Sequence, residues 1–512
     1  MQHITGIARN QMVFTSLEDS ISEDNSVRFV DAFVENIDLK ALGFELQMLK
    51  TEGRPSFSTQ TFLKIYLYGY RNGLRSSRKL EKECVRNIEL QWLLFGLVPN
   101  YHSISDFRKN NPSGLKKLFK VFVSFLKDAD LIAGETIAID GTKSRAHNSK
   151  KANFNQKKID KHLAYIEEKT QQYLDELAQN DEKENNMTIT KIQEKIERLK
   201  KNKLGYEVLE EKLKASGEPQ ISTTDEDSRA LLVQGQVVEV SYNIQAAVDA
   251  QYNLVVATHT INRNDRNALS AIAIEAKENL GIETFTALVD KGYHNGREIT
   301  QCKEQNIITI VAHPDQGKSN ENGTQPDYFV SKFIYNTDDD TYTCPANQVL
   351  KTTGRWHKKT RDRDSYDFKK YRTPACKECP VKSLCTSRTG GREIDRSQYA
   401  DAVAENNQRY QANAQLYRKR QEINEHIFGT IKRQWGYNHT NLTGLEKVNG
   451  EHSLIMLVYN IKRAINILGV PELIAKLKNW KSPYKAKTCF VFRQTCFAFI
   501  LAPLENTLSI AA

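Results

Sequence analysis

Two acids that follow short apolar segments constrain the fold of this chain most strongly. Residues 137–139 form an apolar run that ends on Asp140, with Gly141 directly after it. A second apolar run, 285–289, ends on Asp290. Such runs are typical of buried strands, and acids at the carboxyl ends of strands line the crevice where α/β sheets bind ligands. A single acid of this kind is weak evidence of a site, because many only cap a turn.

The remaining apolar segments extend this pattern into an α/β domain. Strands are predicted at 137–139, 242–248, 254–261, 285–289 and 307–312. Helices are predicted at 266–280, with Asp265 as its cap, and at 296–302. The order is therefore strand, insertion, two strands, helix, strand, helix and strand. If strands 137–139 and 285–289 lie parallel and adjacent, about 4.8 Å apart, Asp140 and Asp290 can share a divalent cation.

Residues 1–130 are predicted to form a helical domain. Helical spacing of apolar residues covers 57–71 and 78–95. Ser103 or Ser105 is expected to cap a further helix that carries Arg108 and Lys109. This pattern suits a helix-turn-helix-like DNA-binding module, and ordinary helix packing explains it equally well.

Residues 151–234 interrupt the α/β pattern with a charged helical insertion and a linker. Apolar residues recur at heptad positions on both sides of a polar break at 180–186, namely Ile159, Leu163, Ile166, Tyr173, Leu177, Ile189, Ile192, Ile196, Leu199, Tyr206 and Leu213. This repeat predicts an antiparallel coiled-coil hairpin. A solvated arm that packs only on itself is the favoured interpretation. Residues 220–229 are expected to form a polar linker.

The net charge of +10 makes polyanions, nucleic acid first, plausible partners. A basic surface without such a partner is the alternative. The first thirty residues lack a signal pattern, and the most apolar segment, 489–504, is too short to span a membrane. Eight cysteines in 512 residues do not make a disulfide scaffold, so we expect a protein of the reducing cytoplasm.

Residues 314–400 form a second insertion that combines basic, aromatic and cysteine residues. The segment 351–372 holds nine Lys or Arg against three Asp, with four aromatic residues between them. Arg355, Lys358 and Lys359 are expected to follow a phosphate backbone while the aromatic rings stack on bases. An ordinary hairpin surface is the alternative. Four cysteines around one C-x2-C pair, Cys344, Cys376, Cys379 and Cys385, predict a structural zinc site, with reduced buried thiols as the alternative.

The long helix predicted over 402–435 carries a third acid. Glu425 and Lys432 are seven residues apart and therefore share a helix face. At this spacing the two side chains cannot pair as an i,i+4 pair would. Both are therefore expected to point at something else, such as a metal ion and a phosphate.

Together these residues resemble the DDE transposases of bacterial insertion sequences. The stretch 102–108 (HSISDFR) resembles part of the helical domain that precedes the catalytic domain in one such group. The resemblance implies that Asp140, Asp290 and Glu425 are the catalytic acids. Tyr417, Arg420, Glu425 and Lys432 resemble the family's Y-(2)-R-(3)-E-(6)-K signature, except that four residues separate Arg420 from Glu425. Strict spacing would place Asn424 there, which cannot replace a carboxylate; Glu422 is the fallback acid.

The resemblance implies a ribonuclease H-like catalytic domain at 131–150 and 235–470, with a mixed five-stranded sheet of order 3-2-1-4-5 and a tail at 471–512. It implies cleavage and strand transfer of DNA with Mg²⁺ or Mn²⁺, two ions held by the three acids. Tyr417, Arg420, Lys432 and, in an assisting role, Lys143 would hold DNA. The expected partners are terminal inverted repeats and target DNA, bound by a homodimer in the bacterial nucleoid. A metal-dependent nuclease and a catalytically silent DNA-binding regulator are the alternatives.

Overall fold

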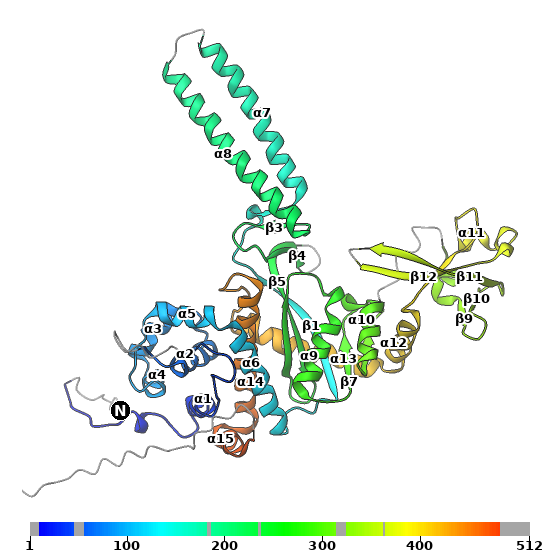
Figure 1. Cartoon of the computed structure of the whole chain (residues 1–512). Coiled ribbons are helices and arrows are strands. Elements are labelled where there is room, and N and C mark those ends of the chain that lie inside the picture. Colours follow the sequence, from blue (N-terminus) through cyan, green and yellow to red (C-terminus); the bar gives the residue numbers. More distant parts are fainter. Residues whose placement is uncertain are drawn as a thin grey trace, which may run out of the picture.

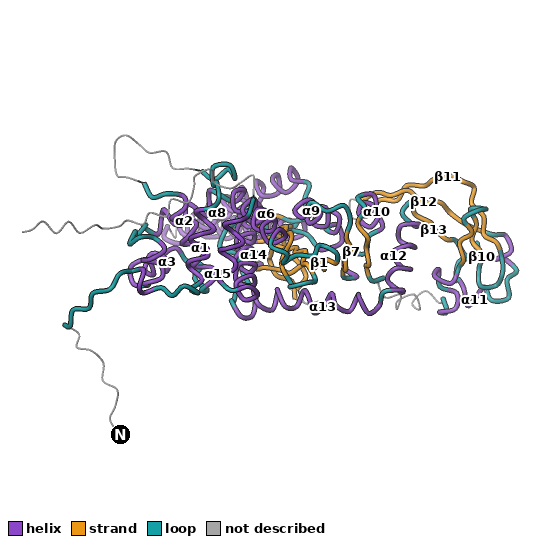
Figure 2. The backbone as a smooth tube through the Cα atoms, turned by 90° about the horizontal axis from the view of Figure 1, so that it is seen from below, coloured by secondary structure: helices purple, strands orange, loops and turns teal. Residues whose placement is uncertain are grey.

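The computed structural model describes residues 10–45, 56–181, 186–233, 237–313, 324–361 and 364–481. A central sheet with its helices lies between an N-terminal group of helices and a separate small sheet (Figures 1 and 2). A helical hairpin projects away from this body (Figure 1). The predicted tail lies outside the described residues from 482 onward.

The N-terminal region is helical and packs directly on the central domain. Its helices are α1 (Ser26–Glu35), α2 (Thr59–Arg71), α3 (Ser77–Arg86), α4 (Ile88–Leu93), α5 (Tyr101–Asn110) and α6 (Pro112–Asp128). Asn87 ends α3 and caps α4, so the helix expected over 78–95 is two helices. Asn100, which accepts a hydrogen bond from the Ser103 backbone N–H, caps α5 in place of the expected serines.

The central sheet is mixed and has six strands. They are β1 (Thr136–Arg145), β4 (Arg229–Val233), β5 (Val237–Asp249), β6 (Leu254–Ile261), β7 (Phe285–Val289) and β8 (Ile307–Val311). Strand β1 pairs antiparallel with β5 and parallel with β7, β7 pairs parallel with β8, and β6 pairs antiparallel with β5. The sixth strand, β4, pairs antiparallel with β5 and occupies part of the sequence expected as a linker.

Strand β1 is longer than its apolar run. The polar residues from Gly141 to Arg145 continue the strand because they pair with Ser241 to Gln245 of β5. Asp140 therefore lies within β1, whereas Asp290 directly follows β7. The expectation that Asp140 ends its strand is wrong, because backbone pairing continues where the apolar pattern stops.

Asparagines from two helices form hydrogen bonds with backbone groups of the edge strands of the central sheet. Asn460 of α14 (Leu445–Leu468) exchanges two hydrogen bonds with the backbone of Val255 in β6. Asn406 of α12 (Ala400–Ala412) does the same with Val311 in β8. Covered edges leave few free backbone groups for unwanted strand pairing. Helix α14 also packs on α6, which joins the helical region to the sheet.

The first insertion forms the projecting hairpin. Its helices are α7 (Gln156–Asp181) and α8 (Asn186–Ser216). At its base the short strands β2 (Asn153–Phe154) and β3 (Ile221–Ser222) pair with each other. A small apolar cluster there includes Phe154, Ile159 and Leu213.

The second insertion is a separate five-stranded antiparallel sheet. Its strands are β9 (Ile334–Asn336), β10 (Thr341–Thr343), β11 (Val349–Arg361), β12 (Asp364–Arg372) and β13 (Ile394–Ser397). Its own small core includes Leu350 and Tyr371. The chain then returns through α12, α13 (Ala414–Phe428) and the π-helical turn η9 (Gly429–Gln434), so the long helix expected over 402–435 is broken at Asn413.

Among the described helices, none is by itself long and apolar enough to cross a membrane. Only α14 taken together with α15 (Val470–Asn479) has the required length and composition, and these two helices meet at an angle of 108°.

Candidate functional site

Asp140 and Asp290 lie side by side on the central sheet, with an arginine between them. The parallel pairing of Ile139 with Val289 brings the two acids to the same level. Arg420 of α13 places Nη1 3.4 Å from Asp140 Oδ2 and Nη2 3.2 Å from Asp290 Oδ1. One guanidinium therefore bridges both carboxylates, an interaction that the sequence analysis did not foresee.

Burial makes Asp140 unusual for an aspartate. It raises the pKa of this carboxyl to about 6, although the hydrogen bond from the Gly141 backbone N–H, at 2.7 Å, and the charge of Arg420 act in the opposite direction. The neighbouring charge of Asp290 raises it further. The surroundings of Asp140 thus disfavour its negative charge, as expected where a further cation can bind.

Lys432 reaches the same strand from the π-helical turn η9. Its Nζ donates hydrogen bonds to Thr142 Oγ1 at 2.9 Å and to the Lys143 carbonyl oxygen at 2.7 Å. In a continuous α-helix Lys432 would lie about 120° around the axis from Arg420. A π-helical turn absorbs one extra residue, which brings Lys432 back to about 20° from Arg420. Burial lowers the pKa of Lys432.

Glu425 is not brought to the two aspartates. It lies about 140° around α13 from Arg420, whereas Asn424 lies only about 40° away. Glu425 is exposed, and its Oε1 accepts a hydrogen bond from Gln421 at 2.8 Å. Asn424 is buried, and neither of its side-chain polar atoms has a partner. Across the described residues, no three acidic, histidine or cysteine side chains are close enough to hold one metal ion.

Two further residues predicted to contact DNA, Tyr417 and Lys143, lie in different surroundings. Tyr417 packs against Arg420, whose guanidinium carbon lies 5.6 Å from the ring centre. Lys143 turns to the other side of β1, where its Nζ is 3.2 Å from Asp265 Oδ2. Asp265 therefore does not cap the following helix, α9 (Leu269–Leu280), whose N-cap is Ala268. The expected assistance of Lys143 at the acids has no support from this geometry.

The basic residues predicted in the second insertion lie on the long hairpin of β11 and β12. Arg355, Lys358 and Lys359 are exposed on β11. Trp356 between them is 50% exposed, and Lys369 of β12 lies 5.2 Å from its ring centre. The hairpin therefore presents cations beside an open aromatic face.

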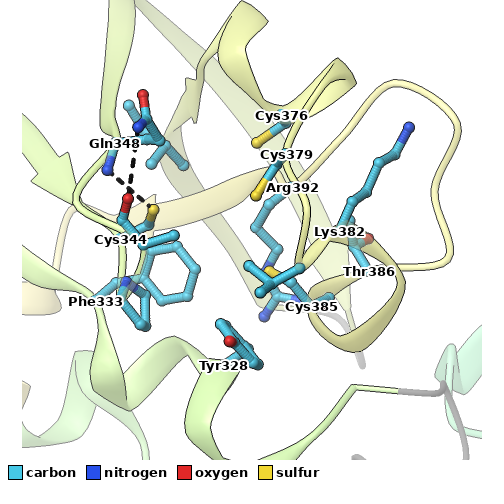
Figure 3. Close-up of a pocket in the computed structure, with 14 residues that line it drawn as sticks. Tyr328, Phe333, Cys344, Gln348, Cys376, Cys379, Lys382, Cys385, Thr386 and Arg392 are labelled. Atoms are coloured by element: carbon cyan, nitrogen blue, oxygen red, sulfur yellow. Dashed lines mark hydrogen bonds between the residues drawn. The ribbon is translucent and has the colours of Figure 1, made fainter.

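The four predicted zinc ligands gather around one cavity in the second insertion (Figure 3). Cys344 follows β10, Cys376 and Cys379 lie in and after a short helical turn, and Cys385 ends the helix α11 (Lys382–Cys385). The Cys344 sulfur accepts a hydrogen bond from the Gln348 backbone N–H at 3.2 Å. Burial raises the pKa of the Cys385 thiol. The thiols share the cavity without forming a closed metal cluster.

In the N-terminal region, Arg108 is not available for DNA. It is 6% exposed and lies 3.7 Å from the buried carboxylate of Glu451. Its guanidinium also donates to the Tyr70 hydroxyl at 2.6 Å. Of the two interpretations of this helix, the position of Arg108 favours ordinary helix packing, because this arginine neutralises an acid of α14 in the core.

Two protein families match the chain. The family described as Transposase DDE domain matches residues 343–465, which include Arg420, Glu425 and Lys432. The family described as Transposase domain (DUF772) matches residues 15–110. No curated protein and no solved structure matches. Asp140 and Asp290 lie outside both matched ranges, so their assignment depends on the geometry.

Proposed function

We propose that this chain, which belongs to the DDE transposases of insertion sequences, cleaves DNA at the ends of its element and joins those ends to target DNA with a divalent metal. The observation that carries the proposal is the pair of carboxylates at Asp140 and Asp290, bridged by a cation. Transposases act on DNA, and the net charge of +10 is consistent with that partner.

The residues present suit Mg²⁺ or Mn²⁺. Carboxylate oxygens are the hard ligands that these ions prefer, and the Arg420 guanidinium marks a position where two carboxylates already accept positive charge. A pair of such ions, when bound, activates the attacking water or 3′-hydroxyl and stabilises the leaving oxygen. Asp140 and Asp290 would hold them. Arg420, Tyr417 and Lys432, which surround the acids, would hold phosphates of the DNA end.

Glu425 is proposed as the third ligand because it is the carboxylate that follows Arg420 in the family's signature. The test is a pair of neighbouring substitutions on the exposed side of α13. Glu425→Gln should abolish cleavage while DNA binding persists, and the matched control Glu422→Gln should retain both. Full cleavage by Glu425→Gln would remove this residue from the site.

One experiment distinguishes a transposase from the two alternatives, a nuclease and a silent DNA-binding regulator. End DNA that has already been cut is incubated with the protein, Mg²⁺ and a target plasmid, and joined products are counted. A transposase produces joints, a nuclease only cuts, and a silent regulator binds DNA without doing either. The catalytic domain is proposed to be ribonuclease H-like and to act as a homodimer, which the mass of the assembled protein–DNA complex would test.

We propose a structural zinc ion for the cysteine cavity. Four thiols that line one cavity supply the donor number of a tetrahedral site. Metal analysis of freshly purified, reduced protein should find about one equivalent of zinc. Less than about half an equivalent would count against the site. Cys379→Ser should lower the zinc content below that of the natural protein.

A further inference from the structure

A network of polar side chains lies directly behind Asp140, on the opposite face of the sheet. Neighbouring positions of a strand point to opposite faces, so Gly141 and Lys143 face away from the side of Asp140. Gln245 and Asn243 of β5 stand opposite Gly141 and Lys143 and share that rear face. Both β5 side chains are fully buried.

Asp265 enters this rear face from the loop after β6 and organises it. Its Oδ1 accepts hydrogen bonds from Asn243 Nδ2 at 2.7 Å and from Gln245 Nε2 at 2.9 Å, and Lys143 Nζ lies near its Oδ2. These donors lower the pKa of the Asp265 carboxyl against the effect of burial. These three donors to the carboxylate all come from β1 or β5.

Gly141 makes this arrangement sterically feasible. A Cβ atom at position 141 would lie 2.4 Å from Gln245 Nε2 and 2.5 Å from Asp265 Oδ1. Any other residue there would displace the side chains that meet behind β1. The glycine next to Asp140 is thus required by the network, independently of backbone conformation.

The network also reaches the second acid. Tyr293 lies three residues after Asp290, in the short turn η4 (Lys291–Tyr293), and is buried. Its hydroxyl donates to Gln245 Oε1. Because the Asp265 carboxylate can only accept, the Gln245 amide nitrogen faces Asp265, which leaves the amide oxygen for Tyr293. The chain Asp265–Gln245–Tyr293 therefore connects β5, beside Asp140, with the turn that follows Asp290.

We infer that Tyr293, Gln245 and Asp265 are positioning residues that hold Asp140 and Asp290 at the spacing required for a divalent cation. The inference rests on the proposed function of the two acids. None of the three residues faces the front of the sheet, so they act through the elements that carry the acids. Mg²⁺ and Mn²⁺ tolerate little departure from their preferred geometry, and supporting residues behind metal ligands typically contribute 10- to 100-fold to affinity.

The test compares two tyrosines that differ in their connections. Tyr293→Phe removes the hydroxyl that binds Gln245. Tyr242→Phe is the matched control: Tyr242 is also buried and donates to a buried carboxylate, Asp225 at 2.6 Å, which is not part of the network. Mn²⁺ binding to each full-length protein is measured by electron paramagnetic resonance, with Asp140→Asn defining the specific site. Cleavage of end DNA is measured in parallel.

Tyr293→Phe should weaken specific Mn²⁺ binding about tenfold, whereas Tyr242→Phe should change it less than about twofold. Equal affinities in the two variants, or no specific binding in the natural protein, would overturn the inference. A tenfold loss of affinity without any cleavage by the natural protein would instead reject the proposed function and leave the positioning role standing. Normal cleavage by the natural protein, together with equal Mn²⁺ affinities in the two variants, would reject the positioning role and leave the proposed function standing. Melting temperatures of both variants identify a general loss of fold.

Discussion

Two clusters of acids and arginines in this molecule show how the same residue types serve different ends. In the core, Glu451 of α14 is fully buried and lies 2.7 Å from Arg75 and 3.7 Å from Arg108. Its second carboxylate oxygen accepts the backbone N–H groups of Asn441 and Leu442. On the sheet, Asp140 and Asp290 share one arginine, and their side chains are 30% and 40% exposed.

The two clusters shift the pKa of Glu451 and of Asp140 in opposite directions. The two arginines and the donors around Glu451 lower its pKa to about 2, whereas burial with incomplete compensation raises the pKa of Asp140 to about 6. The core cluster has two arginines for one carboxylate, so a substitution there removes favourable interactions. The sheet cluster lacks positive charge and can gain from a metal ion. This difference separates a structural ion pair from a candidate active site.

The largest expected effect is the loss of chemistry from the sheet cluster. Asp140→Asn keeps the shape of the side chain and removes its charge, so cleavage in Mg²⁺ should fall at least about a thousandfold, without a loss of melting temperature. Asp130→Asn, at an exposed acid outside the site, is the control. Unchanged cleavage by Asp140→Asn would disprove the catalytic assignment.

The core cluster should respond in the opposite way. Glu451→Gln leaves Arg75 and Arg108 without their buried counter-ion, which should lower the free energy of unfolding by about 3–5 kcal/mol. Urea unfolding measures this change. Should the variant fail to fold, Arg75→Lys gives a milder form of the same test. An unaltered free energy of unfolding would show that the buried charge of Glu451 does not contribute to stability.

Removal of the bridging Arg420 tests whether this cation competes with a metal ion at the sheet cluster. Arg420→Ala takes away the cation that competes with a metal ion, so Mn²⁺ binding without DNA should tighten by about fivefold, the equivalent of about 1 kcal/mol for a partly exposed ion pair. Cleavage should nevertheless fall, because a phosphate contact is lost. Arg418→Ala, two residues away and exposed, should alter neither quantity. Weaker Mn²⁺ binding in Arg420→Ala would show that Arg420 supports the cation.

A further effect is expected on the pH dependence of cleavage. Because the pKa of Asp140 is raised, this group takes up a proton as the pH falls through about 6, and a protonated carboxyl does not bind Mg²⁺. The Mg²⁺ concentration for half-maximal cleavage should therefore rise between pH 7 and pH 5, by at most about tenfold per pH unit. Asp140 should also make the fold less stable as the pH rises from about 4 to about 6, since the native state then binds more protons than the unfolded chain.

Glu451 provides the contrast in the same titration. Its lowered pKa contributes stability that is fully present above about pH 4.5 and is lost only as the pH falls towards 2. Unfolding curves between pH 5 and pH 7 should thus be insensitive to Glu451. A flat Mg²⁺ dependence over that range would argue against a raised pKa at Asp140.

Those parts of the fold that depend on local periodicity could be predicted from the sequence. The strands around Asp140 and Asp290 have apolar runs, and both helices of the projecting hairpin have heptads. Contributions from distant partners could not be predicted. The polar half of β1 exists because β5 pairs with it, and Arg108 is buried because Glu451, more than 300 residues later, needs a counter-ion.

Only part of the candidate site could be predicted from the sequence. Strand order placed Asp140 beside Asp290, and the signature located Arg420 and Lys432. The helix face of Glu425 relative to Lys432 could not be predicted, because a count of residues along an α-helix does not anticipate the π-helical turn between them. The role of Asp265 could not be predicted, since nothing in its local sequence reveals that three donors from β1 and β5 converge on it.

The π-helical turn η9 sets the rotation of α13 relative to Lys432. With Lys432 fixed on β1, conversion of the turn to α-helix would rotate the preceding helix by about 100°. Arg420 would then leave the aspartates, and Glu425 would move to the face of Lys432. Under the proposed function, one such shift of register would exchange Arg420 for Glu425 beside the two aspartates. A DNA- and metal-bound structure with η9 intact and Glu425 still outside would exclude this switch.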